Sequence, residues 1–146
     1  MVPEPRAPFS QIVLADTYAH LSGLVAADFP EGRAALGDVA GETRAVLNVI
    51  GRMLREIGLD TDRVVRMDVH LATLDDFNAM DAVYREFFDP GPYPARTTTE
   101  SPRLFGGSRV EITCMARRRS FPSGIRGTAD VNPRGRLAST PLEIGL

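Results

Sequence analysis

The spacing of apolar residues changes abruptly near the middle of this 146-residue chain, and this change constrains the fold more than any other feature. From Val39 to Ile57 the apolar side chains recur every three or four residues, which predicts a helix with one buried face. From Arg63 to Ala72 they alternate with polar side chains, which predicts a strand with one buried face. Because each element must cover its apolar face, the two segments together predict a layered α+β fold.

A second amphipathic helix is predicted after this strand. Thr73 and Asp76 have the spacing of a capping box, in which two side chains satisfy the free N–H groups at a helix start. Apolar residues then continue at helical spacing as far as Phe87, and the Asp89-Pro90 step ends the helix.

Three further segments complete the predicted sheet. Residues 11–24 predict a hairpin with its turn at 15–17, the threonine-rich segment 96–100 predicts a strand, and residues 110–116 alternate as another strand. The order is two strands, helix, strand, helix and two strands, which predicts a mixed β-sheet with two helices packed on one face. The other face of the sheet would be uncovered, so we expect the chain to self-associate.

Composition narrows the possible partners. The formal net charge is -2, so the chain has no general attraction for the phosphates of nucleic acid, and none is expected as a partner. No apolar run approaches the roughly 20 residues that a spanning helix needs, and the N-terminal residues lack the pattern of a signal peptide. We therefore expect a cytoplasmic protein with no membrane contact. Residues 1–117 are predicted to form the domain, and residues 118–146, rich in Arg, Gly and Pro, a tail.

The chain offers little material for a metal or cofactor site. Cys114 is the single cysteine, and His20 and His70 have no second ligand at metal-binding spacing. Gly106-Gly107 is too short for a phosphate loop and joins two predicted strands. We therefore expect no metal and no cofactor.

Two side chains are candidates for chemistry. Arg96 follows a proline-rich turn at the start of a strand, where its planar guanidinium can hold a carboxylate. Glu111 lies in the middle of a strand and points away from the core-facing Val110 and Ile112, where a carboxylate can activate water. Each also has an ordinary alternative: Arg96 can pair with a surface acid, and Glu111 can be a solvated residue of the sheet.

Six short motifs, taken together, resemble the RidA/YjgF family. They occur in the order and spacing of that family over roughly residues 8 to 117, and they are Pro8–Gln11, Leu21–Gly23, Asp75–Phe77, Val83–Phe88, Pro94–Thr97 and Val110–Ile112. The resemblance implies a chorismate-mutase-like fold of the bacillar type and a homotrimer whose active sites lie in the clefts between subunits.

The same resemblance implies roles for individual residues. Arg96 corresponds to the arginine that grips the substrate carboxylate, and Glu111 to the glutamate that positions the hydrolytic water. Ser22, Gly23 and Thr98 correspond to residues that line the family's cleft.

The implied reaction is the cofactor-free hydrolysis of an enamine or imine, such as 2-aminoacrylate, to a 2-keto acid and ammonia. The chain departs from well-characterised members at three substrate-binding positions, with Phe9 in place of tyrosine, Thr98 in place of cysteine and Asp81 in place of asparagine. Loss of the phenol at Phe9 removes a hydrogen-bond donor near the substrate, which leaves the choice of substrate open.

Two alternative functions follow from these departures. One is a pathway-specific deaminase of the same family with a larger, 2-aminomuconate-like substrate. The other is a non-catalytic regulatory protein that binds small carboxylates. Ribonuclease activity has also been attached to this family, but the sequence shows neither a histidine pair nor a basic face to support it.

Overall fold

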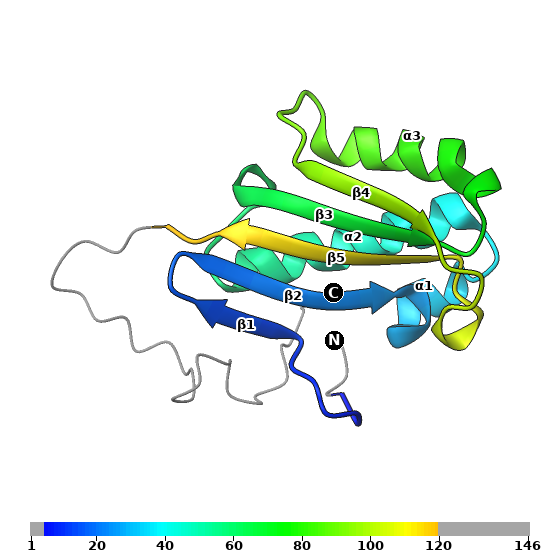
Figure 1. Ribbon diagram of the computed structural model, residues 1–146, viewed down its shortest axis with the longest axis horizontal. Coiled ribbons are helices and arrows are strands. Elements are labelled where there is room, and N and C mark those ends of the chain that lie inside the picture. The colour runs from blue at the N-terminus through cyan, green and yellow to red at the C-terminus, as the bar shows by residue number, and fades with distance from the viewer. Residues whose placement is uncertain (1–4, 120–146) are drawn as a thin grey trace, which may run out of the picture.

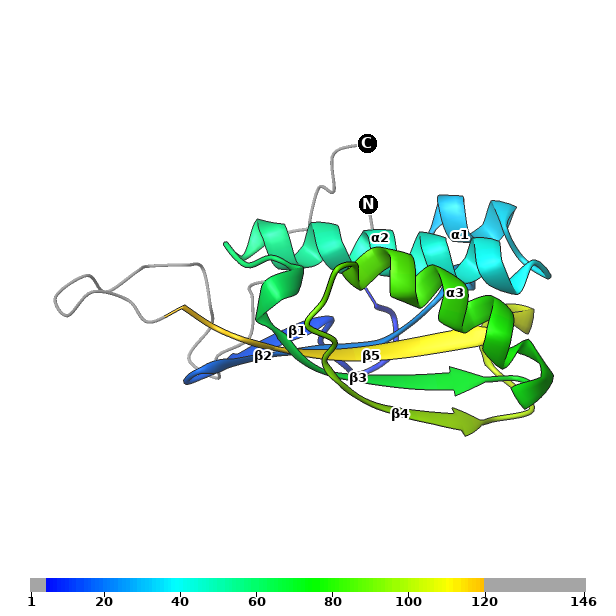
Figure 2. The ribbon, with the colours of Figure 1, turned by 90° about the horizontal axis from the view of Figure 1, so that it is seen from above.

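A computed structural model describes residues 5–119 as a five-stranded sheet with helices on one face (Figures 1 and 2). The strands are β1 (Ile12–Ala15), β2 (Tyr18–Val25), β3 (Val64–Leu71), β4 (Ala95–Glu100) and β5 (Val110–Arg117), and the helices are α1 (Pro30–Ala34), α2 (Val39–Glu56) and α3 (Phe77–Phe88). Apart from its first two residues, the tail predicted at 118–146 lies outside the described residues.

The sheet is mixed, as the sequence predicts. Its strand order is β1-β2-β5-β3-β4, which Figure 1 shows from one edge to the other. β3 and β4 are parallel and are joined through α3, whereas the other neighbouring strands are antiparallel. The view in Figure 2 places α2 and α3 together on one side of the sheet, which confirms the predicted α+β arrangement with both helices on one face.

The helix α2 forms where the sequence predicts it because its apolar stripe is buried. Val46, Leu47, Ile50 and Leu54 are each at most 1% exposed and belong to the main core. The helix ends just before Gly58, whose φ of +76° is a left-handed conformation that glycine adopts without strain.

The start of α3 differs from the prediction. Thr73 caps a 3₁₀ turn at Leu74–Asp76, where its hydroxyl accepts a hydrogen bond from Asp75 N at 3.2 Å. The predicted role of Asp76 in a capping box is wrong: its two carboxylate oxygens accept from Arg109 at 2.7 and 2.9 Å. A bidentate, charge-assisted pair is stronger than one bond to a backbone N–H, and it ties this turn to the start of β5.

The alternation along β3 also differs from the prediction at one end. Val64 is 8% exposed and lies in the core, while Val65, the predicted core residue, is only partly buried. The cause is an irregularity in the β3–β5 pairing between Val64 and Arg66. It interrupts the alternation, so Val64 and not Val65 faces the core.

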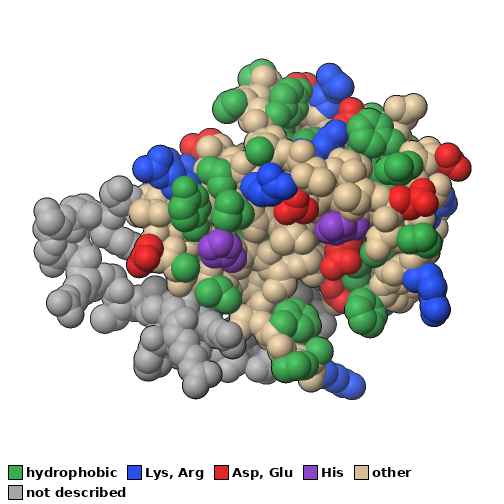
Figure 3. All heavy atoms as spheres, viewed as in Figure 1, with side chains coloured by type: hydrophobic (Ala, Val, Ile, Leu, Met, Phe, Trp, Pro, Cys, Tyr) green, Lys and Arg blue, Asp and Glu red, His purple; other side chains and the backbone are tan. Residues whose placement is uncertain are grey.

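The face of the sheet opposite the helices is uncovered in the single chain. The register places on it the following side chains: Arg66, Asp68, His70, Thr97, Thr99, Glu111 and Thr113. They form cross-strand contacts, such as Arg66 donating to Thr97 Oγ1 at 2.7 Å and a 2.7 Å hydrogen bond between His70 and Thr99. Figure 3 shows this face, with both histidines and a mixture of charged and apolar side chains. Among the described helices, none is long and apolar enough to cross a membrane.

Candidate functional site

The residues singled out in the sequence fall into two groups in the structure. Phe9, Ser22, Gly23 and Glu111 line one pocket, which we call the Glu111 pocket. The other group lies on the helix side of β4 and contains Arg96, Thr98 and Asp81, which we call the Arg96 cluster.

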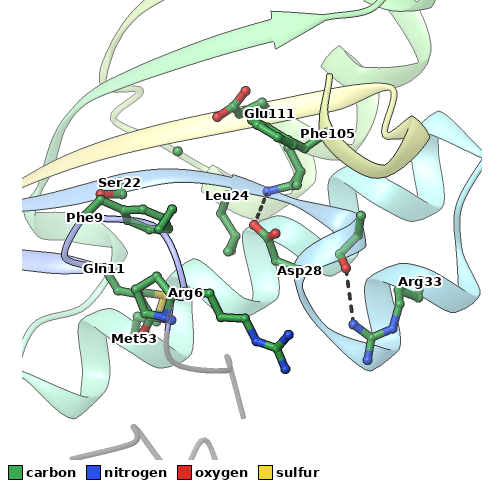
Figure 4. Close-up of a pocket in the computed structure, with 15 residues that line it drawn as sticks. Arg6, Phe9, Gln11, Ser22, Leu24, Asp28, Arg33, Met53, Phe105 and Glu111 are labelled. Carbon is green, nitrogen blue, oxygen red and sulfur yellow. Dashed lines mark hydrogen bonds between the residues drawn. The ribbon is translucent and has the colours of Figure 1, made fainter. Parts of the chain in front are cut away.

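The Glu111 pocket opens at the edge of β2, beyond the end of its pairing with the short strand β1. It has a volume of about 740 Å³ and is bounded by the N-terminal segment, β2, the loop that contains Phe105, and α2. Figure 4 shows Glu111 on one side of β2, and Asp28, Arg33 and Met53 on the other. Most of the lining is apolar, so an organic acid could place its side chain there.

Gly23 makes room for the carboxylate of Glu111. The β2–β5 register is irregular between Leu21 and Leu24, and Gly23 therefore lies directly against the Glu111 side chain. A Cβ atom at position 23 would lie 3.1 Å from Glu111 Cδ and would clash with Oε1. Glycine is thus the residue that allows the carboxylate to occupy this place.

Ser22 fixes the segment that carries Phe9. Its hydroxyl donates to Ser10 O at 2.6 Å, and its backbone N–H donates to Gln11 O at 2.9 Å. The Phe9 ring is 50% exposed where it lines the pocket. Ser22 therefore acts on the pocket through the position of the N-terminal segment.

Several residues of the pocket were not predicted from the sequence. They include Leu24, Asp28, Arg33, Met53 and Phe105, of which Phe105 is 84% exposed. Asp28 and Phe105 lie in short 3₁₀ turns, where no hydrophobic period marks them. Burial raises the pKa of the Asp28 carboxyl above its usual range, against the opposing effects of a hydrogen bond from Val25 N and the charge of Arg33.

The Arg96 cluster fixes a guanidinium between β4 and α3. Arg96 Nη1 donates to Asp81 Oδ1 at 2.7 Å, and the Arg96 side chain is 21% exposed. Its Cζ lies 4.6 Å from the ring centroid of Tyr84 and 5.4 Å from that of Phe77. The ordinary alternative for Arg96, an ion pair with an acid, is therefore present, but in a half-buried aromatic setting that also restricts the guanidinium.

Tyr84 provides a neutral face to this cation. Burial raises the pKa of its phenol to about 12, although the charge of Arg96 opposes the shift. Its hydroxyl is buried and has no hydrogen-bond partner among the described residues. Because the phenol stays protonated, Tyr84 contributes its π face and no charge to the cluster.

Arg96 and Glu111 do not meet within one chain. Arg96 pairs in register with the buried Met67, and Glu111 pairs with His70 three residues further along β3. Side chains alternate between the two faces of a strand, so Arg96 points to the helix side and Glu111 to the open face. The candidate site is therefore present as two halves on one chain.

Neither half resembles a metal or thiol centre. Within residues 5–119, no three His, Cys, Asp or Glu side chains are grouped so that they could hold a metal ion. Cys114 is 2% exposed, and burial raises the pKa of its thiol to about 12, so its thiolate is scarce at neutral pH.

The fold and the two halves define a class of protein: a small α+β sandwich with a carboxylate on the open face of its sheet and a guanidinium on the helix side. Comparison with known proteins gives the family. Residues 1–118 match the endoribonuclease L-PSP family. A human protein named 2-iminobutanoate/2-iminopropanoate deaminase is 35% identical over 114 residues, which cover 78% of this chain and 82% of the relative.

Solved structures agree with this match. The YjgF gene product of E. coli superposes with a TM-score of 0.71 at 27% identity, covering 81% of this chain and 94% of that one. The structure of E. coli TdcF with bound serine gives a TM-score of 0.72 at 25% identity, with the same coverage. The chain belongs to the endoribonuclease L-PSP family, which is the RidA/YjgF family that its motifs resemble.

Proposed function

We propose that this protein hydrolyses imines of amino acids, such as the imine tautomer of 2-aminoacrylate, to 2-keto acids and ammonia. Arg96 holds the substrate carboxylate, and Glu111 positions and activates the attacking water. The observation that carries the proposal is the carboxylate of Glu111 over Gly23 in a pocket with a largely apolar lining. The name of the 35% identical human relative supports the same reaction.

The proposed chemistry needs few groups. Water adds to the imine carbon while Glu111 accepts one of its protons and passes it to the nitrogen, which gives a carbinolamine. Glu111 then transfers the carbinolamine hydroxyl proton to the nitrogen, and the C–N bond breaks to release ammonia as the carbonyl of the 2-keto acid forms. An imine carbon is already electrophilic, so orientation of the acid and of one water molecule can supply the rate enhancement. Neither step requires a metal or an organic cofactor.

The site we propose is shared between neighbouring copies of the chain. Arg96 lies on β4, at one edge of the sheet, whereas the Glu111 pocket lies at β2, near the opposite edge. A contact between two different surfaces of identical chains is head-to-tail, and such contacts form a closed ring when the rotation between neighbours divides a full turn evenly. A homotrimer of the chorismate-mutase-like type, with three such sites, satisfies this requirement and also covers the open face of the sheet.

The test is hydrolysis of imines generated in situ from alanine and from leucine by an amino-acid oxidase. We expect the protein to accelerate the release of ammonia. Arg96→Ala and Glu111→Gln should each lower kcat/KM by at least about a hundredfold, because positioned acid–base groups contribute that much. Full activity in the Arg96→Ala protein would refute the role of the guanidinium.

A mixing experiment tests whether the site is shared. The two inactive variants are denatured together and refolded in equal amounts. If Arg96 and Glu111 come from different chains, random assembly restores about a quarter of the wild-type sites. If both groups act within one chain, no activity returns.

A larger substrate is the second candidate, and one observation favours it. Phe9 and Phe105 line the pocket and are 50% and 84% exposed, so they offer more apolar surface than a methyl side chain would cover. The leucine-derived imine in the same assay addresses this possibility, since a preference for it over the alanine-derived imine would favour the larger substrate class.

A further inference from the structure

We propose that Asp81 is a positioning residue that holds Arg96 in its orientation and weakens its grip on the substrate carboxylate. The inference rests on the proposed function, because it concerns the same guanidinium. It goes beyond the proposed function because Asp81 acts through Arg96 and does not itself contact the substrate.

The contacts show that Asp81 occupies one side of the guanidinium. Its Oδ1 accepts from Arg96 Nη1 at 2.7 Å, while its Oδ2 lies 3.4 Å from Arg85 Nη2, one helical turn further along α3. The Asp81 side chain is 24% exposed. The planar guanidinium has five N–H donors, so one side can be held by Asp81 while another remains for a ligand carboxylate.

The aromatic residues of α3 complete the fixation. Phe77, Asp81 and Tyr84 are spaced four and three residues apart, so they lie on one face of the helix toward Arg96. The rings restrict how far the guanidinium can tilt, and the Asp81 carboxylate fixes its rotation in the plane. An arginine held in this way loses less conformational entropy when it binds a ligand.

The charge of Asp81 has the opposite effect on affinity. A carboxylate bound on the other side of the guanidinium would lie about 6 Å from the Asp81 carboxylate. At that distance the repulsion between the two negative charges lowers the affinity about threefold in water and about a hundredfold at the effective dielectric of a protein surface. Arg85, Arg96 and Asp81 together carry one net positive charge. Without the negative charge of Asp81 the two arginines would carry two.

Weaker binding of the carboxylate has a catalytic purpose in this reaction. The 2-keto acid product carries the same carboxylate as the substrate, so a tighter grip would retain both. Binding energy that is equal for the substrate and the transition state lowers KM without raising kcat. By weakening the binding of this carboxylate, Asp81 favours release of the 2-keto acid and so favours turnover.

The test compares Asp81→Asn with Asp81→Ala, and uses Glu86→Gln as the matched control. Asparagine can still accept a hydrogen bond from Arg96 but carries no charge, whereas alanine provides neither. Glu86 lies on the same helix, five residues further on, and its Oε2 lies 3.7 Å from Nη2 of the exposed Arg44. Glu86→Gln therefore removes one negative charge from α3 but leaves the contacts of Arg96 unchanged.

The readouts are the Kd for pyruvate by calorimetry and the steady-state constants for the alanine-derived imine. We expect Asp81→Asn to bind pyruvate at least about threefold more tightly, with lower KM and a kcat that is unchanged or lower. Asp81→Ala should bind more weakly than Asp81→Asn because the guanidinium loses its fixed orientation. Glu86→Gln should match the wild type.

Two results would overturn the inference and leave the proposed function intact: wild-type affinity in Asp81→Asn, or equal affinities in Asp81→Asn and Asp81→Ala, each with normal turnover by the wild type. If no form of the protein binds pyruvate or hydrolyses any imine, two proposals are refuted together: that Arg96 binds the substrate carboxylate, and that Asp81 weakens this binding.

Discussion

Replacement of Gly23 by alanine should separate the activity of this protein from its stability. The added Cβ would lie 3.1 Å from Glu111 Cδ, whereas carbon atoms in contact prefer about 3.5–4.0 Å. Glu111 is the flexible partner, so its carboxylate should move by about 1 Å rather than force the strands apart. A displacement of that size in a reacting group costs roughly a hundredfold in rate.

The effect on stability should be small and of the opposite sign. Gly23 lies within a strand, and alanine there loses less conformational freedom on folding, which is worth about 0.5–1 kcal/mol. The cost of moving the Glu111 side chain offsets part of this gain. We expect a free energy of unfolding within about 1 kcal/mol of the wild type, measured by urea denaturation at a fixed protein concentration.

Gly51→Ala is the matched control. Gly51 lies within α2, and a Cβ there would lie 3.3 Å from the flexible end of Arg55 and 3.6 Å from the Phe87 ring. It should stabilise the helix by up to about 1 kcal/mol and leave imine hydrolysis unchanged. If Gly23→Ala retains wild-type activity while Glu111→Gln is inactive, the placement of the carboxylate by Gly23 is not what the reaction requires.

Two further predictions concern carboxyl groups. Glu42 is 0% exposed and accepts hydrogen bonds from Gly37 N and Arg109 N at 2.9 and 2.8 Å, so Glu42→Ala should lower the free energy of unfolding by about 2–5 kcal/mol in urea titrations; a loss below 1 kcal/mol would mean that water replaces both bonds. Because burial raises the pKa of Asp28, its protonated form favours folding, and the stabilisation present below its unfolded pKa is lost as pH rises through the raised value. Asp28→Asn should therefore raise the unfolding midpoint at pH 7 more than at pH 3, and an equal shift at both pH values would contradict this linkage.

The elements that the sequence predicted well are those whose signal is local. The stripe of α2 and the alternation of β5 each report one buried face within a single segment, and the core contains nearly all of those residues. The short helix α1 was missed because five residues are too few for a periodic pattern. The role of Asp76 was missed because its partner, Arg109, is distant in sequence.

In the candidate site, too, the local features were predicted and the contacts between distant segments were not. Arg96 and Glu111 were found from residue type, position on a strand and the family resemblance. Their placement on opposite faces depends on the register of β4 and β5 against β3, which no local pattern encodes. The contacts of Arg96 with Tyr84 and Asp81 likewise require α3 to pack over β4, which no local pattern predicts.

The irregular pairing between Leu21 and Leu24 has a consequence beyond the placement of Glu111. Strand β1 has only four residues, so within residues 5–119 no strand pairs with the last part of β2 on its outer side. A regular strand with free backbone groups is a template on which other chains can aggregate. A bulge bends a strand away from the flat geometry that fibril-like stacking requires, so the same irregularity that gives the Glu111 carboxylate its place also makes this edge a poor template for other chains.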